Sequence, residues 1–389
     1  MTTPSNSLVR GTDLLLPTYA RTDVTIVRGE GTRVWDSDGR EYLDFGSGIA
    51  VVGLGHGHPA PLAAASAQLE RLWHASNLYR TEPAQELAGR LSERFGGARA
   101  FFCNSGTEAV EAAVKFARKA TGKPGVVAVE GGFHGRTLGA LSVTGQPSKR
   151  EPFEPLVPGA RFVPANDVAA LRGAVAEDTG LVLLEPILGE GGVRPLEPEF
   201  VLAAAEAAEQ AGALLCLDEI QTGVGRTGTF FAFEQLGVRP HLVTLAKALA
   251  NGLPVGALLV SDEAPPGLGP GDHGSTFGGN PVSCAAACAV VDAIDDGLLA
   301  NVREQSEALQ AGLADLPGVT EVRGRGLLLG AELDRPAQAV LDESRARGLL
   351  VLSAGETVLR LAPPLTVDSE DVGAALTVLH AALEASFTA

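Results

Sequence analysis

Ala213-Leu-Leu-Cys-Leu-Asp-Glu219 is a short apolar run that ends on two carboxylates. An unbroken apolar run of this length is typical of a strand buried on both faces, and such strands occur in parallel sheets covered by helices. Ligands of α/β proteins bind at the carboxyl ends of these strands, which is where Asp218 lies. The stretch therefore predicts an α/β fold with a functional carboxylate at one edge of its sheet.

Other apolar runs lie on both sides of this stretch, and helix-like segments separate most of them. The full set covers residues 100–103, 126–129, 160–164, 181–185, 213–217, 241–245 and 255–260. This alternation predicts a large domain with a mostly parallel sheet covered by helices. After an alanine-rich helix at 283–294, short strands at 320–323, 327–332, 349–352 and 357–361 predict a smaller α+β domain.

The apolar run His241-Leu-Val-Thr-Leu-Ala-Lys-Ala-Leu-Ala-Asn251 contains one formal charge, that of Lys247. Aliphatic neighbours keep water from the ammonium group and lower its pKa, which makes the amine a better nucleophile towards a carbonyl. Pyridoxal phosphate chemistry needs such an amine, and a carboxylate such as Asp218 to keep the pyridine nitrogen protonated. Each residue also has an ordinary interpretation, because lysines at element ends often reach water and aspartates after strands often cap turns.

Two loops add candidate cofactor contacts. Ser105-Gly-Thr107 follows a strand-like segment and opens a strong helix, whose free backbone N–H groups would bind phosphate. Ser105 and Glu108 also form a capping-box pattern, which needs no ligand. In the loop Glu130-Gly-Gly-Phe-His-Gly-Arg-Thr137, Phe133 would either stack on a flat ring or only pack within its loop.

Composition restricts the partners. The net charge of −17 argues against nucleic acid and anionic membranes, which attract basic surfaces. The four cysteines lie in or beside apolar runs without paired spacing, so we expect buried free thiols in a reducing compartment. We expect no metal, because no further ligand cluster accompanies His56-Gly-His58. The sequence from Met1 shows neither an apolar targeting segment nor a membrane span, which predicts a cytoplasmic location.

The segment Gly223-Val-Gly-Arg-Thr-Gly228 matches G-x-G-x-x-G and makes a nicotinamide oxidoreductase the rival enzyme class. Thr229-Phe-Phe-Ala-Phe233 follows it instead of a clean amphipathic helix, which argues against a dinucleotide site. A non-catalytic binding protein is a third alternative. The presence of Lys247 argues against it.

Taken together, five motifs resemble those of the class III pyridoxal-phosphate aminotransferases, in the order of that family and within a likeness that covers nearly the whole chain. They are Ser105-Gly-Thr-Glu-Ala109, Phe133-His-Gly-Arg-Thr137, Leu217-Asp-Glu-Ile-Gln-Thr-Gly-Val-Gly-Arg-Thr-Gly228, Leu245-Ala-Lys-Ala-Leu249 and Gly274-Ser-Thr-Phe-Gly-Gly-Asn-Pro281. The resemblance implies the type I transferase fold. An N-terminal arm (1–60) would pack with a small domain (283–389), beside a large cofactor-binding domain (61–282). It also implies a homodimer whose two subunits build each active site.

The resemblance implies a role for each matching residue. Lys247 would hold pyridoxal phosphate as a Schiff base and then shuttle the proton, and Asp218 would hold the pyridine nitrogen. Phe133 would cover the ring. The other cofactor contacts would come from Ser105, Gly106, Thr107, His134 and Gln221, with Thr276 arriving from the neighbouring subunit.

The resemblance also assigns substrate contacts. Arg136 would receive the α-carboxylate of an acylated diamine and Arg360 that of glutamate, although either arginine would equally suit a salt bridge between domains. Glu190 would mask Arg360 when no carboxylate occupies it, and Ser275 would add a further contact.

Two positions depart from patterns of relatives. Ile49 stands where ornithine-specific relatives have a tyrosine that serves free ornithine, which favours an acylated substrate. Leu188 replaces a usual glutamine and puts one local hydrogen bond in doubt. The implied reaction transfers the δ-amino group of N2-acetylornithine to 2-oxoglutarate, giving N-acetylglutamate 5-semialdehyde and glutamate in arginine biosynthesis. N-succinylornithine, succinyl-diaminopimelate, ornithine, γ-aminobutyrate and carrier-bound lysine intermediates stay open as alternative donors.

Overall fold

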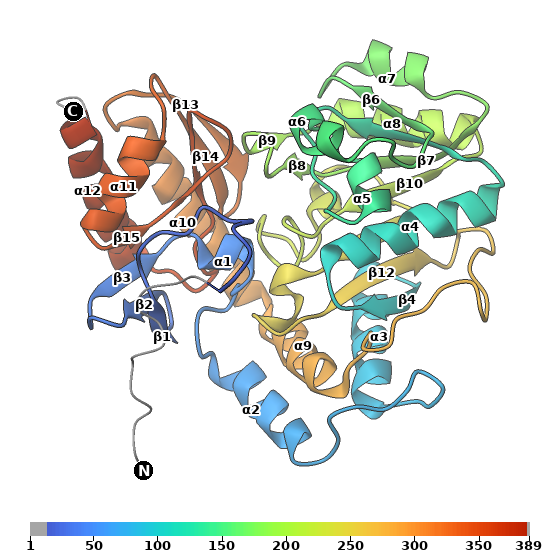
Figure 1. Ribbon diagram of the computed structural model, residues 1–389, viewed down its shortest axis with the longest axis horizontal. Coiled ribbons are helices and arrows are strands. Elements are labelled where there is room, and N and C mark those ends of the chain that lie inside the picture. Colours follow the sequence, from blue (N-terminus) through green and yellow to red (C-terminus); the bar gives the residue numbers. More distant parts are fainter. Residues whose placement is uncertain (1–13, 387–389) are drawn as a thin grey trace.

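The computed structural model describes residues 14–386, and its centre is a seven-stranded sheet (Figure 1). The strands run in the order β4-β12-β11-β10-β7-β5-β6. Their bounds are Ala98–Cys103, Gly256–Ser261, Leu242–Leu245, Leu214–Asp218, Thr179–Leu184, Gly125–Val129 and Ala160–Val163. Only β12 runs antiparallel to its neighbours. Each strand predicted for the large domain is present, and the mostly parallel sheet is confirmed.

Side chains of the central strands alternate between two cores. Leu214 and Cys216 of β10 pack towards α4 (Gly106–Thr121), whereas Leu215 and Leu217 face α8 (Pro198–Gln210) and α9 (Pro281–Ala293) on the other side. Because successive strand residues point to opposite faces, a strand with helices on both sides must be apolar throughout. This explains why the stretch before Asp218 is unbroken by polar residues.

Further helices complete the layers around this sheet. They are α3 (Glu82–Phe95), α5 (Leu138–Ser142), α6 (Pro147–Arg150) and α7 (Val168–Ala174), with the short helices η2 (Glu151–Phe153), η3 (Ala232–Gln235) and η4 (Lys247–Ala250). A two-stranded ribbon of β8 (Ile187–Leu188) and β9 (Arg194–Pro195) follows β7. Helix α2 (Pro59–Leu69) packs on α9.

The C-terminal part forms a second sheet, in the order β13-β14-β17-β16. Its strands are Val319–Arg325, Leu328–Leu333, Val358–Leu361 and Leu352–Ser353. Helices α10 (Asp296–Ala314), α11 (Gln338–Ala346) and α12 (Ser369–Ser386) accompany this sheet. The predicted α+β composition of this region is therefore present.

The N-terminal strands join the C-terminal part through a long-range pairing. Strands β1 (Ile26–Glu30), β2 (Arg33–Asp36) and β3 (Glu41–Asp44) form a meander, and β15 (Leu349–Leu350) adds to β3 in parallel. The prediction of a single strand at 349–352 is wrong, because two short strands occupy this region. Strand β15 pairs with β3, whereas β16 pairs with β17. Residues 1–13 of the predicted arm lie outside the described residues, and the predicted domain boundaries stay predictions.

Three further features of the described residues can be compared with the sequence. Cys103, Cys216, Cys284 and Cys288 are buried and free, as predicted. Among residues 14–386, no helix combines the length and apolarity needed to cross a membrane. In the same range, His, Cys, Asp and Glu side chains do not gather in threes to hold a metal ion.

Candidate active site

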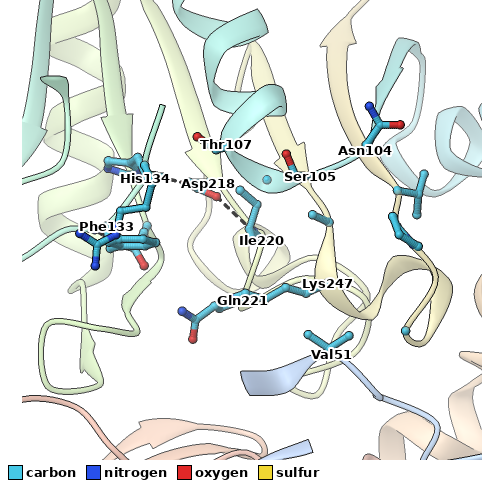
Figure 2. A pocket seen from close by; sticks show the side chains of 18 of the residues that line it. Val51, Asn104, Ser105, Thr107, Phe133, His134, Asp218, Ile220, Gln221 and Lys247 are labelled. Carbon is cyan, nitrogen blue, oxygen red and sulfur yellow. Dashed lines mark hydrogen bonds and ion pairs between the residues drawn. The ribbon is translucent and has the colours of Figure 1, made fainter. Parts of the chain in front are cut away.

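Strand register brings Asp218 and Lys247 to one edge of the central sheet. Asp218 is the last residue of β10 and lies opposite Thr244 of β11, and Lys247 begins η4 two residues after β11 ends. Both residues line a cavity of about 380 Å³, within the range typical of small-molecule sites. Figure 2 shows Ser105 and Thr107 at one end of this cavity and Val51, which follows α1 (Ser47–Ala50), at the other.

Asp218 is buried and accepts three hydrogen bonds, which leaves one acceptor site of the carboxylate open. It accepts one from Nδ1 of His134 at 2.7 Å, one from Oγ1 of Thr244 at 2.9 Å and one from the N–H of Ile220 at 3.2 Å. Burial opposes the charge on His134, but the hydrogen bond and the charge of Asp218 outweigh it and raise the pKa of His134. The structure thus holds the side chains of His134 and Asp218 against each other without exposing either.

Lys247 is buried, and its backbone has a φ of 45°, in the left-handed region that side chains other than glycine rarely adopt. Burial lowers the pKa of its ammonium group to about 8, although the charge of Glu190 opposes this shift. Within residues 14–386 its Nζ forms no hydrogen bond or ion pair. Strained backbone and an unpartnered, weakly basic amine are typical of a reactive position.

The N-terminus of α4 lies at the same cavity. Ser105 caps this helix and accepts the N–H of Glu108, while Glu108 accepts the N–H of Asn104 at 2.6 Å. Ser105 therefore caps the helix as predicted, but the second half of the capping box is replaced, because Glu108 accepts the backbone N–H of Asn104 and not that of Ser105. Ser105, Gly106 and Thr107 also line the cavity. A Cβ on Gly106 would lie 2.6 Å from Cδ1 of Ile220, so any larger residue there would require the Ile220 side chain to move. Capping and anion binding are compatible, because the bond from the N–H of Glu108 to Ser105 leaves other first-turn N–H groups free.

The wall formed by Phe133 is fixed by a buried acid. Its backbone N–H donates to Oε1 of Glu185 at 2.7 Å, and Glu185 also accepts the N–H of Gly189 at 3.2 Å. Burial raises the pKa of Glu185 to about 7, while the charge of His134 opposes that shift. The cations of Arg136 and Lys149 lie 5.5 and 4.8 Å from the centroid of the Phe133 ring.

Gln221 supplies the clearest sign that this cavity suits a polar ring. Its Oε1 is buried and has no hydrogen-bond partner, while its Nε2 donates to Oε1 of Glu190 at 3.3 Å. An unpaired buried amide oxygen is costly and points to a donor group that is not part of the protein. Together with Asp218 and the helix N-terminus, it fits the ring hydroxyl, pyridine nitrogen and phosphate of pyridoxal phosphate.

A second ion pair lies next to Gln221. Nη1 of Arg360 on β17 donates to Oε1 of Glu190 and to the carbonyl of Gly189, the latter at 3.1 Å. Burial acts to raise the pKa of Glu190, but the charge and hydrogen bond of Arg360 outweigh it and lower that pKa. The two residues are far apart in the sequence, and the fold brings them together beside the cavity, as the resemblance implies.

Other predicted site residues lie outside this cavity. Ser275 accepts hydrogen bonds from Asn104 and from the N–H of Gly278, both at 3.0 Å, and Thr276 is exposed. Neither lines the cavity of this chain, and the predicted contribution of Thr276 to a neighbouring subunit stays a prediction. Ile49 is partly exposed in α1, and Leu188 is buried in β8.

Sequence reasoning assigned no role to Glu185, Thr244 and Lys149. Glu185 directly follows a buried strand, the same signal that identified Asp218, and Thr244 is the strand partner of Asp218. No sequence signal identifies Lys149, whose position depends on the packing of α6. The loop 223–228 consists of turns and starts no α-helix, in agreement with the rejection of a dinucleotide site.

Known sequences agree with this geometry. The family model Aminotransferase class-III matches residues 17–383. The chain is 50% identical to an acetylornithine aminotransferase of Streptomyces coelicolor over 95% of this chain and 93% of that protein. It is also 50% identical to one of Mycolicibacterium smegmatis, over 95% and 96% of the two chains.

Solved structures give the same family. N-acetylornithine aminotransferase of Stenotrophomonas maltophilia is 40% identical, with a TM-score of 0.82 over 95% of this chain and 98% of that one. Ornithine aminotransferase of Toxoplasma gondii, whose active site holds pyridoxal phosphate at partial occupancy, is 32% identical with a TM-score of 0.91, over 96% and 92%. The resemblance and the predicted fold class are both confirmed. The chain therefore belongs to the class III aminotransferases, which are pyridoxal-phosphate-dependent enzymes with the type I fold.

Proposed function

We propose that this enzyme transfers the δ-amino group of N2-acetylornithine to 2-oxoglutarate, giving N-acetylglutamate 5-semialdehyde and glutamate in arginine biosynthesis. The observation that carries the proposal is the ion pair of Glu190 and Arg360 beside Lys247. An enzyme that handles a terminal amine and an α-amine in turn needs an arginine that is available to a carboxylate in only one half-reaction. The acetylornithine aminotransferases among the relatives support the same substrate.

The cavity offers contacts for each part of the cofactor. Gly106 and Thr107 would hold its phosphate through the N-terminus of α4, and Asp218, which lies against His134, would hold its pyridine nitrogen protonated. When bound, pyridoxal phosphate supplies an electron sink for the substrate carbon that carries the amine. Phe133 would cover one face of the ring and Gln221 would meet its hydroxyl.

Lys247 is the group that moves the proton. Its amine, with a pKa of about 8, has a substantial neutral fraction at slightly alkaline pH and accepts a proton from the substrate carbon. As an ammonium group it would pass that proton to the cofactor carbon within the same half-reaction, and the transfer would run in reverse when the keto acid receives the amino group. A left-handed backbone and buried surroundings hold the amine in place without a competing hydrogen bond.

Arg360 and Arg136 would divide the carboxylates between them. Glutamate would place its α-carboxylate on Arg360, displacing Glu190, and its second carboxylate near Arg136. Acetylornithine has one carboxylate, far from the reacting amine, and would place it near Arg136 while Glu190 stays on Arg360. Replacement of one partner by another of equal charge keeps the guanidinium paired in both half-reactions.

We also propose a homodimer with shared active sites. Trp73, Leu78, Tyr79 and Phe277 are large apolar side chains that are exposed in one chain, which supports a covered surface in the assembly. Thr276, next to Phe277, is exposed and would reach the cofactor of the second subunit. We place the enzyme in the cytoplasm because its buried thiols are free. Its net charge of −17 supports small-molecule partners over nucleic acid and anionic membranes.

A panel of separate half-reactions tests the substrate. The purified holoenzyme is mixed with N2-acetylornithine, N-succinylornithine, succinyl-diaminopimelate, ornithine or γ-aminobutyrate, and the loss of the cofactor absorbance is followed by stopped flow. We expect the largest second-order rate constant with N2-acetylornithine. A larger constant for any other donor would replace the proposed substrate, while the assignment to the family would stand.

A further inference from the structure

Lys149 lies beside the active site, although its place in the sequence does not suggest it. It belongs to the short helix α6, its side chain is half-buried, and its Nζ lies 4.8 Å from the centroid of Phe133. The guanidinium of Arg136 lies 5.5 Å from the same centroid. Phe133 and Arg136 line the cavity, and Lys149 approaches the same aromatic ring from beside the cavity.

The charges around Lys149 leave it without a partner. Burial lowers its pKa, and so does repulsion from Arg136 and Arg360, against attraction by Glu190 and Glu185. Glu190 already pairs with Arg360, and Glu185 accepts two backbone N–H groups. Within residues 14–386, neither Lys149 nor Arg136 forms an ion pair with a carboxylate.

Two neighbouring cations without an anion are unfavourable in the free protein. Their repulsion and the loss of hydration both destabilise the arrangement, and a chain with a net charge of −17 has many carboxylates with which to neutralise them. A ligand carboxylate placed between the two cations would attract both of them and would offset their repulsion and their lost hydration. Charge-assisted hydrogen bonds to a desolvated carboxylate are strong. Packing of a lysine on an aromatic ring is the ordinary alternative.

We propose that Lys149 is a specificity-determining residue that forms, with Arg136, a two-cation subsite for the substrate carboxylate farthest from the reacting amine. The inference rests on the proposed function and deepens it. In one half-reaction the subsite would hold the α-carboxylate of acetylornithine, and in the other the side-chain carboxylate of glutamate or 2-oxoglutarate. The same pair of cations would thus position the distant end of both substrates.

Binding of glutarate to the holoenzyme tests the subsite without any turnover. Glutarate has two carboxylates and neither an amine nor a keto group, and calorimetry gives its dissociation constant directly. We expect Lys149→Met, which keeps much of the length but removes the charge, to weaken glutarate about five- to tenfold. Lys149→Arg should bind within about twofold of wild type, because it restores the cation.

Kinetics with a matched pair of donors separates binding from packing. Lys149→Met should raise KM for acetylornithine about five- to tenfold at nearly constant kcat, the pattern of a lost contact made equally in ground state and transition state. The carboxamide of acetylornithine has no carboxylate, so Lys149→Met should leave its kcat/KM unchanged. Lys119→Met, which removes a surface cation that pairs with Asp272, is the control and should change neither donor.

Each outcome bears on the inference. Equal glutarate binding in wild type and Lys149→Met would overturn it, as would an equal loss of kcat/KM for the acid and the carboxamide. Unfolding of both Lys149→Met and Lys149→Gln, seen as lost cofactor and lowered Tm, would overturn it too, because Lys149 would then be a packing residue. An error in the proposed substrate would be seen in a different measurement, because wild type would then prefer another donor. The glutarate measurement would still test Lys149.

Discussion

Two ion pairs beside Lys247 have the same chemistry but different surroundings. The side chains of His134 and Asp218 are 1% and 2% exposed, and Asp218 accepts two further hydrogen bonds. In the pair of Arg360 and Glu190, the carboxylate side chain is 24% exposed and lies in a loop with glycines on both sides. A carboxylate held by three hydrogen bonds is fixed in place, whereas a partly exposed one beside the cavity can be exchanged for the carboxylate of a substrate.

The largest loss of activity should follow from replacing Lys247, because both ion pairs lie around this residue. Lys247→Ala removes the amine that moves the proton, so kcat should fall by about 10⁴-fold or more with either amino donor. Cofactor should still be retained through its phosphate, as measured by its release on denaturation after gel filtration. A variant that keeps more than about a tenth of wild-type kcat, a loss of only ~1.4 kcal/mol, would contradict the role of Lys247.

The second prediction disrupts the buried pair of His134 and Asp218. Asp218→Asn keeps the shape but removes the carboxylate that raises the pKa of His134 and would hold the pyridine nitrogen protonated, so both half-reactions should slow by about 10²–10³-fold to a similar extent. Single-turnover stopped flow with acetylornithine and with glutamate measures each rate. Asp292→Asn, which breaks a surface pair with Arg90, is the matched control. Unchanged single-turnover rates in Asp218→Asn would return Asp218 to the role of a turn residue.

The third prediction disrupts the pair of Arg360 and Glu190, and the two amino donors should respond differently. Glu190→Gln leaves Arg360 charged but less well paired, which favours glutamate and lets the carboxylate of acetylornithine bind there in an unproductive pose. A buried charge-assisted hydrogen bond contributes roughly 1.5–3 kcal/mol, so the ratio of kcat/KM should move about tenfold or more towards glutamate. Separate half-reactions measure the ratio. A ratio that stays constant or moves towards acetylornithine would make Glu190 a structural carboxylate.

The fourth and smallest expected effect is on stability: the contributions of the two ion pairs to the free energy of unfolding should depend on pH in opposite ways. The pKa of Glu190 is lowered from 4.5, so its stabilisation is fully present above about that pH and is lost as pH falls through the folded value. The pKa of His134 is raised from 6.5, so its stabilisation is fully present below about that pH and is lost as pH rises. The two pairs should therefore weaken at opposite ends of the pH range.

Urea unfolding of the apoenzyme at fixed protein concentration measures these contributions. The midpoint difference between wild type and Glu190→Gln should shrink below about pH 4.5, and that between wild type and His134→Gln should shrink above about pH 6.5. Each unit of pKa difference corresponds to about 1.4 kcal/mol in the free energy of unfolding. If the midpoint difference changed with pH in the same direction for both variants, the proposed opposite pH dependence of the two pairs would be contradicted.

Local sequence was sufficient for the sheet and for the first members of the site. An apolar run that ends on Asp218, and another that is interrupted only by Lys247, identify themselves because strand burial and carboxyl-edge placement follow from neighbouring residues. Ser105 and Glu108 likewise predict the start of α4. The family motifs then named Arg136, Glu190 and Arg360, whose partners no local pattern indicates.

Tertiary structure decided what depends on residues far apart in the chain. Leu349 pairs with Leu43 and not with its neighbours in sequence. The pKa of His134 is raised because Asp218 lies against it, and Lys149 reaches Phe133 only through the packing of α6. Hydrophobic periodicity determines which face of an element is buried, because it depends on the residues of that element alone. The orientation of a charged side chain and its pKa depend on every charge packed around it, and only the folded chain brings those charges together.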